Sequence, residues 1–195
     1  MRHLHAGLAG LTRIETLVVV GVGGLLLIVV LLLPVFGQRR DKMAHLKCLD
    51  NLRELGAGVY LYADDHDARL PSAEREPSNP INPTNSLACI CELLTNYVDL
   101  SGQPFFCPAD KGPHGQPPSY YIREGTSYEW NYKNNGRSVE EMTALGGVGE
   151  IPLMYDFENF HRGPAGPSKN VLLGDGRAEP LMKPRPPGRP PPPGK

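Results

Sequence analysis

The sequence lacks a charge bias of either sign, and it lacks the common signatures of hydrolytic catalysis. Its 195 residues carry 20 Lys and Arg against 21 Asp and Glu, a formal net charge of −1. No basic stripe or charged block is present, which argues against a nucleic-acid surface because phosphate binding needs clustered cations. No Gly-x-Ser-x-Gly motif or comparable Ser/His/Asp signature occurs. We therefore expect neither a nucleic-acid-binding protein nor an enzyme.

Charge is also missing from residues 16–36, which form an apolar run. At about 1.5 Å rise per residue, its roughly twenty residues match the roughly 30 Å hydrocarbon core of a bilayer. A cleaved secretory signal would have a shorter apolar region, about 7–15 residues, and a small-x-small cleavage site. This run instead ends in bulky residues at 31–36. The sequence therefore predicts a single membrane-spanning helix.

One carboxylate, Glu15, stands at the entrance of the apolar run. A charged side chain near hydrocarbon costs on the order of 2.5–3.5 kcal/mol, so an acid in this place needs a partner and indicates a function.

Beyond the run, residues 38–179 leave room for one domain with a modest core. Apolar residues recur every three or four positions over 38–63, which predicts that the membrane helix continues as an amphipathic helix packed on that domain. The stripe consists of Met43, Leu46, Leu49, Leu52, Leu55, Val59 and Tyr62. Residues 180–195 are dominated by proline and are expected to form a disordered tail.

The remaining segments are short. Residues 86–98 have helical spacing, whereas aromatic and β-branched enrichment between turn residues favours strands at 104–108, 120–122, 127–132, 151–155 and 170–173. Gly174-Asp175-Gly176 predicts a tight hairpin turn. The expected fold class is α+β, with one long N-terminal helix, transmembrane and then amphipathic, packed on a small antiparallel sheet.

Four cysteines, Cys48, Cys89, Cys91 and Cys107, are candidates for disulfides in an oxidising compartment. The single residue between Cys89 and Cys91 is short for relaxed disulfide geometry, so two pairings remain, both joining these two cysteines to Cys48 and Cys107. Free buried cysteines are one alternative. A zinc site of Cys89, Cys91, Cys107 and His114 is another, but it has no second closely spaced ligand pair, and no metal is predicted.

Two further groups of residues carry weaker signals. Asp65 and Asp67 alternate as calcium ligands do, but Arg69 and Leu70 break the pattern, so a solvated helix end is expected. A second pair, His161 and Asp175, could act as a catalytic or metal-binding couple. No nucleophile accompanies them in the sequence, so a structural role is expected.

The N-terminal sequence Gly10-Leu11-Thr12-Arg13-Ile14-Glu15, followed by the apolar run, resembles a type IV prepilin signal, although Arg13 and Thr16 depart from the residues usual there. The body resembles prepilin-type proteins with a C-terminal His and Asp-Gly signature, common in planctomycetes and related bacteria. The matching segments are Cys48-Leu49-Asp50-Asn51-Leu52, Tyr62-Ala63-Asp64-Asp65, Phe106-Cys107-Pro108-Ala109-Asp110, Ser127-Tyr128 with Asn131, and the block from His161 to Asn170-Val171-Leu172-Leu173-Gly174-Asp175-Gly176. Together they span most of residues 10–179.

This resemblance implies a pilin-like fold and a structural subunit, major or minor, of a type IV pilus-like or type II secretion-like filament. A prepilin peptidase and methylase would remove the leader, residues 1–10, after Gly10 and methylate Leu11. Residues 11–37 would span the bacterial inner membrane, and 38–179 would lie outside the cytoplasm, in a surface or periplasmic filament. Glu15 would pair with the amine of Leu11 in a neighbouring subunit. The partners of the whole chain would be the prepilin peptidase and methylase, other pilin subunits and the membrane.

Family members also bind calcium in a loop near the sheet. No matching pattern of acids is present here, so no ligands are assigned and no cofactor is expected. The alternative function is a single-pass membrane-anchored extracytoplasmic binding protein that does not assemble. The filament subunit and the membrane-anchored binding protein are distinguished by whether the mature chain begins at Leu11.

Overall fold

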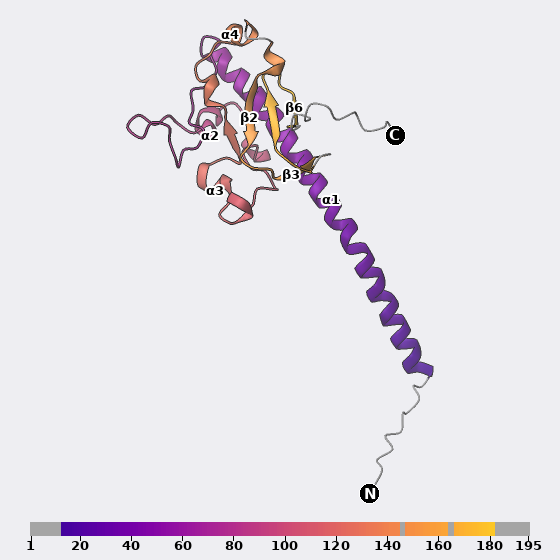
Figure 1. Cartoon of the computed structure of the whole chain (residues 1–195). Helices are drawn as coiled ribbons and strands as arrows, with labels where there is room; N and C mark the ends of the chain where they lie inside the picture. Colours follow the sequence, from indigo (N-terminus) through magenta and orange to yellow (C-terminus); the bar gives the residue numbers. More distant parts are fainter. Residues whose placement is uncertain (1–12, 145–146, 164–165, 182–195) are drawn as a thin grey trace, which may run out of the picture. The chain divides into compact units, whose positions relative to one another are not determined.

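The computed structural model describes residues 13–144, 147–163 and 166–181 (Figure 1). The chain divides into two compact units, Met1–Lys42 and Met43–Lys195, which are described separately below. Gly10 and Leu11, the expected leader and nearly all of the expected proline-rich tail lie outside the described residues.

The described part of the first unit belongs to helix α1 (Arg13–Asp65). Its stretch Arg13–Leu31 contains 19 residues with a mean hydropathy of 2.7, and its side chains are exposed. At about 1.5 Å per residue this stretch measures about 28 Å, close to the thickness of a bilayer core. The helix is long and apolar enough to cross a membrane, as predicted, and Glu15 lies in its first turn.

In the second unit α1 is amphipathic, but its buried stripe begins later than predicted. Met43 and Leu46 are 66% and 46% exposed, whereas from Cys48 onward one face of the helix is buried. Two glycines that weaken the helix let it come close to its neighbours. A Cβ on Gly56 would lie 2.9 Å from Leu172, and one on Gly58 would lie 2.5 Å from Val98.

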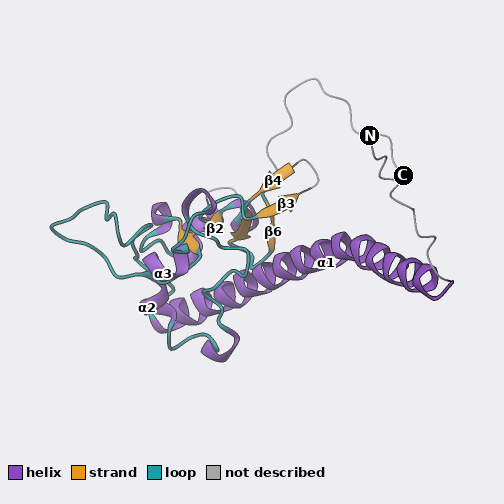
Figure 2. Ribbon diagram, turned by 90° about the horizontal axis from the view of Figure 1, so that it is seen from below, coloured by secondary structure: helices purple, strands orange, loops and turns teal. Residues whose placement is uncertain are grey.

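The main sheet has four strands, β1 (Tyr128–Trp130), β2 (Pro152–Asp156), β5 (Asn170–Leu173) and β6 (Ala178–Pro180). Their order is β1-β2-β5-β6 and every neighbouring pair is antiparallel. A separate hairpin pairs β3 (His161–Gly163) with β4 (Gly166–Ser168). Figure 2 shows these strands along one side of α1. The structure confirms the α+β class and the small antiparallel sheet.

The turn at 174–176 was correctly predicted, because it joins β5 to β6. The Gly176 N–H donates to the Leu173 carbonyl at 3.0 Å, and Gly176 has a φ of +84°, which favours glycine. The Gly174 carbonyl accepts a hydrogen bond from the Tyr60 hydroxyl on α1. This turn therefore also attaches the sheet to the helix.

Two predicted strands are wrong. The predicted strand 120–122 lies in helix α3 (Tyr120–Glu124), since the Ser119 side chain caps its N-terminus and Gly125 ends it in a left-handed conformation. The other segment, 104–108, contains no strand. The Cys107 N–H there donates to the Ser127 hydroxyl rather than to a neighbouring strand.

The predicted helix at 86–98 is shorter than expected, because α2 covers only Ile90–Leu94. The buried Glu74 carboxylate accepts the N–H groups of Ile81 and Leu87, which holds the preceding chain in an irregular loop. The other short helices are α4 (Val139–Ala144) and the 3₁₀ turns η1 (Leu100–Gly102), η2 (Pro113–Gly115), η3 (Tyr132–Asn134) and η4 (Val148–Glu150).

The core lies between α1 and the sheet. Leu52 and Leu55 of α1 pack there with Tyr128, Trp130 and other large side chains of the sheet, all fully buried. Burial of such side chains stabilises a domain by about 1.5–3 kcal/mol each, so this layer is the main source of the domain's stability.

Candidate functional site

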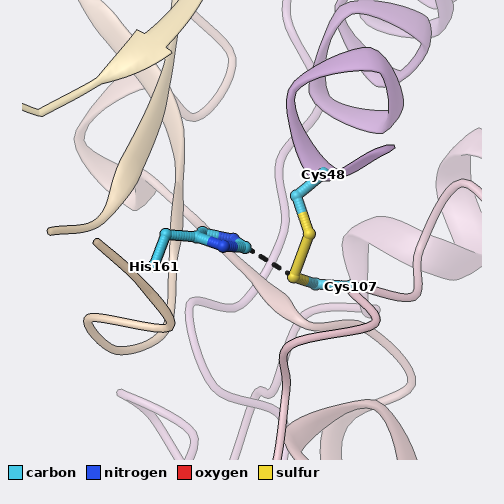
Figure 3. A group of neighbouring side chains, drawn as sticks. All are labelled: Cys48, Cys107 and His161. Carbon is cyan, nitrogen blue, oxygen red and sulfur yellow. Dashed lines mark hydrogen bonds between the residues drawn. A yellow bond between two sulfur atoms is a disulfide. The ribbon is translucent and has the colours of Figure 1, made fainter. Parts of the chain in front are cut away.

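The most distinctive chemistry of the domain is a polar cluster in its interior. At its centre Cys48 of α1 forms a disulfide with Cys107, with the two Cα atoms 5.2 Å apart. Both cysteines are fully buried. The His161 ring, at the start of β3, places Nε2 3.4 Å from the Cys107 sulfur (Figure 3).

Three more polar side chains complete this group. The Asp156 carboxylate, at the end of β2, lies 3.6 Å from His161 Nε2 and accepts the Asn170 N–H at 2.6 Å. The Asn170 side-chain oxygen accepts from His45 Nε2 at 2.8 Å. The His45 and His161 rings stack with centroids 4.6 Å apart. We call these residues the buried polar cluster: His45, Cys48, Cys107, Asp156, His161 and Asn170.

Part of the cluster's hydrogen-bonding capacity is unfilled. Within the described residues, Asp156 Oδ1 and Asn170 Nδ2 are buried and have no hydrogen-bond partner. Buried polar atoms are nearly always paired, and an unpaired one costs about 1–3 kcal/mol. The cluster thus retains a carboxylate oxygen able to accept a proton, a hydrogen bond or a cation.

Burial controls the charges of the cluster. It raises the pKa of Asp156 to about 8, although the Asn170 N–H and the nearby Lys169 charge oppose this rise. Burial also lowers the pKa of His161 to about 4, with a further contribution from His45. At neutral pH Asp156 is therefore mainly protonated and His161 is a neutral imidazole, which is the form that binds metals.

The predicted disulfide pairing is wrong. Cys89 bonds to Cys91, with the two Cα atoms 5.1 Å apart, and Cys48 bonds to Cys107. Cys89 caps α2 in an extended conformation and the helix begins at the next residue. This bend brings the two Cα atoms within the range of about 4.4–6.8 Å that disulfides require.

The zinc alternative is also contradicted, because its four residues do not meet. Cys107 bonds to Cys48, while Cys89 and Cys91 bond to each other. The His114 side chain is 94% exposed and lies 3.8 Å from Glu158.

The suggested couple of His161 and Asp175 does not form. Asp175 lies in the turn between β5 and β6, where it accepts hydrogen bonds from the Arg177 N–H and guanidinium. These bonds lower the pKa of Asp175. His161 instead faces Cys107 and Asp156.

The acidic segment after the amphipathic helix is a helix end, as predicted. α1 stops at Asp65, and the Ala68 N–H returns to the Ala63 carbonyl at 2.9 Å. Asp67 and Ala68 both adopt left-handed conformations there.

Sequence reasoning missed His45, Asp156 and Asn170. One signal was present, because His45 and Cys48 are three residues apart in a helical segment and so share a face. The other two residues lie on strands whose pairing brings them together, and no local pattern reports that pairing.

Comparisons with models of known protein families, with curated proteins and with solved structures find no match.

Proposed function

We propose that this chain is a structural subunit, major or minor, of a prepilin-type filament of the type IV pilus or type II secretion class, rather than an enzyme. The observation that carries the proposal is the make-up of α1. A single helix has a carboxylate in its first turn, continues as an apolar stretch of membrane length, and ends as a face packed on an antiparallel sheet.

The carboxylate gives this helix a means of assembly. Glu15 would neutralise the amine of a methylated Leu11 in the adjacent subunit after cleavage at Gly10. Neither charge is favourable in hydrocarbon alone, and removing one member of a buried ion pair typically costs about 3–5 kcal/mol. Mutual pairing would therefore select the correct axial position of each added subunit.

The domain fits a location outside the cytoplasm. It holds two disulfides, and disulfides persist mainly in oxidising compartments such as the bacterial periplasm. Such a location follows if α1 is a single-pass anchor in the inner membrane with the leader on the cytoplasmic side. The domain would then decorate the outside of a filament whose core consists of packed apolar helices.

The first experiment is N-terminal sequencing and intact-mass analysis of the protein from cells that contain a prepilin peptidase. The expected product begins at methylated Leu11. A chain that keeps Met1, or one cut beyond Phe36, would refute the filament proposal, and an intact Met1 would favour a membrane-anchored binding protein.

The second experiment measures incorporation into sheared filaments. Glu15→Gln removes the charge and keeps the side-chain size, so incorporation should fall by a factor of about 100 or more, which corresponds to about 3 kcal/mol. Glu15→Asp is the matched control, because it retains the carboxylate and should preserve part of the incorporation. Membrane insertion should be unchanged in both. Normal incorporation of Glu15→Gln would show that the carboxylate has no role in assembly.

A further inference from the structure

The buried polar cluster places metal-binding atoms unusually close together. The two sulfurs of Cys48 and Cys107 and a ring nitrogen of His161 all lie within 4.8 Å of one another, and all three residues are buried. They come from α1, the loop before η2, and β3 (Figure 3). Folding alone therefore assembles three ligands of the types that zinc prefers.

Two distances from the His161 ring fit a tetrahedral site. Zinc lies about 2.3 Å from sulfur and about 2.0–2.2 Å from nitrogen or oxygen, so ligand atoms around a tetrahedral zinc ion are about 3.3–3.8 Å apart. His161 Nε2 lies 3.4 Å from the Cys107 sulfur and 3.6 Å from Asp156 Oδ2. The sulfur–sulfur bond is too short for this geometry, and reduction breaks that bond. Asp156 is not among the three residues whose ligand atoms lie within 4.8 Å of one another, so its carboxylate would move toward the sulfurs when zinc binds.

The candidate fourth ligand, Asp156, lies beside His161. Asp156 is fully buried, and its Oδ1 has no hydrogen-bond partner within the described residues. Around it, Asn170 donates its N–H to Oδ2 and holds His45 against the His161 ring. Hydrogen bonds of this kind orient the ligands of metal sites.

We propose that the reduced chain binds one Zn²⁺ through Cys48, Cys107, His161 and Asp156, and that the cluster alternates between this zinc-bound form and the disulfide form. The site would be closed and structural, since four protein ligands fill a tetrahedral shell. This proposal does not depend on the filament role.

The exchange between the two forms is balanced. A dithiol or phosphine reductant supplies two electrons, and two protons are taken up as the disulfide becomes two thiols. Zinc then binds both thiolates and the Asp156 carboxylate, and three protons go to solvent, two from the thiols and one from Asp156. In the reverse direction a disulfide oxidant accepts two electrons and becomes two thiolates, the sulfur–sulfur bond of the chain forms again, Zn²⁺ leaves and Asp156 takes up a proton from solvent. The zinc form would therefore be present only where thiols are kept reduced.

The test uses the full chain in detergent micelles, reduced with a phosphine without oxygen and titrated with Co²⁺. One Co²⁺ per chain should bind, giving the visible bands of tetrahedral cobalt and a thiolate charge-transfer band, and Zn²⁺ should displace it. The oxidised chain should give neither band. Absence of these bands from the reduced chain would overturn the proposal.

Variants assign the ligands. His161→Ala should abolish the tetrahedral spectrum, and Asp156→Asn should weaken Zn²⁺ binding by at least about tenfold, the lower end of the effect of residues that merely support a ligand. The matched control is Cys89→Ala with Cys91→Ala, which removes the other two thiols and should leave the spectrum unchanged. Loss of the bands in this control, or their survival in His161→Ala, would overturn the assignment.

Folding is followed by the fluorescence of Trp130, the single tryptophan of the chain, which is fully buried in the core. Oxidised His161→Ala and Asp156→Asn should keep the native emission, so that any loss of metal binding reflects loss of a ligand. In the reduced wild-type chain Zn²⁺ should raise the urea concentration at which this emission changes. An unchanged urea midpoint in the presence of Zn²⁺ would also overturn the proposal.

Discussion

The disulfide between Cys48 and Cys107 is expected to contribute most of the covalent stabilisation of the oxidised domain. The two cysteines are 59 residues apart in the sequence. In the chain-entropy treatment, closing a loop of about 60 residues stabilises the folded state by about 4 kcal/mol. Replacing both cysteines by alanine should lower the free energy of unfolding by about that amount.

The second disulfide provides a matched control with a smaller expected loss of stability. Cys89 and Cys91 are separated by 2 positions, and the same treatment gives about 1.5 kcal/mol for so small a loop. The double alanine variant of this pair should therefore be less destabilised by about 2.5 kcal/mol. Each change removes two sulfurs. Cys91 is only partly buried, so the loss of this pair also leaves the smaller cavity, which acts in the same direction as its shorter loop.

Urea unfolding of the oxidised full chain in micelles, followed by Trp130 fluorescence, measures both variants. The tryptophan reports on the domain because it lies in the core, far along the chain from the membrane-length segment. With a urea dependence of about 1–3 kcal/mol per molar, the two midpoints should differ by about 1 M or more. Equal midpoints, or the larger loss in the Cys89 and Cys91 variant, would refute the loop-length reasoning.

Three other predictions follow from local contacts. Gly125→Ala should lower the free energy of unfolding by about 1–3 kcal/mol, measured by urea titration, because Gly125 has a φ of +79° and its Cβ would lie 2.7 Å from the Cys91 sulfur. Asp110→Ala should cost about 3 kcal/mol or more and increase hydrogen exchange nearby, since this buried carboxylate accepts three backbone N–H groups and one hydroxyl. In the disulfide form, the pKa of Asp156 is raised to about 8, so its contribution makes the free energy of unfolding fall as the pH rises from about 4 to 8. The pKa of His161 is lowered to about 4, so its contribution makes the free energy of unfolding rise between about pH 4 and 6.5. The two effects cancel below pH 6.5, so unfolding titrations should show a net loss of about 2 kcal/mol between pH 6.5 and 8, absent in Asp156→Asn.

Features of the fold with a local cause were predictable from the sequence. Helix α1 follows from an apolar run and then a periodic stripe, and the turn at 174–176 follows from the backbone freedom of its glycines. The two wrong strands have aromatic composition but are set by other contacts. The Ser119 cap makes one a helix, and the hydrogen bond that the Cys107 N–H donates to the Ser127 hydroxyl holds the other.

The candidate site was largely unpredictable because it depends on contacts between segments that are far apart in the sequence. Each cluster member is an ordinary residue in its own segment, and their proximity arises only when α1 packs on the sheet. The disulfide prediction is wrong because it took the single residue between Cys89 and Cys91 as too short for a bridge, whereas a helix begins at that residue. The sequence indicates His161 but pairs it with Asp175 in the turn, whereas its acidic partner, Asp156, lies in β2.

The position of the Cys48–Cys107 disulfide connects the buried cluster to the proposed assembly role. Among the described residues of α1, Cys48 is the first that is buried, whereas Met43 and Leu46 before it are exposed. The covalent bond therefore lies where the helix enters the domain core. In a subunit held by its apolar helix, a load along α1 would reach the domain in the turn that contains His45 and Cys48, and the covalent bond would pass it to the Cys107 loop. A zinc ion bound to the same two sulfurs would keep that connection in the reduced chain, so either state of the cluster would hold helix and domain together.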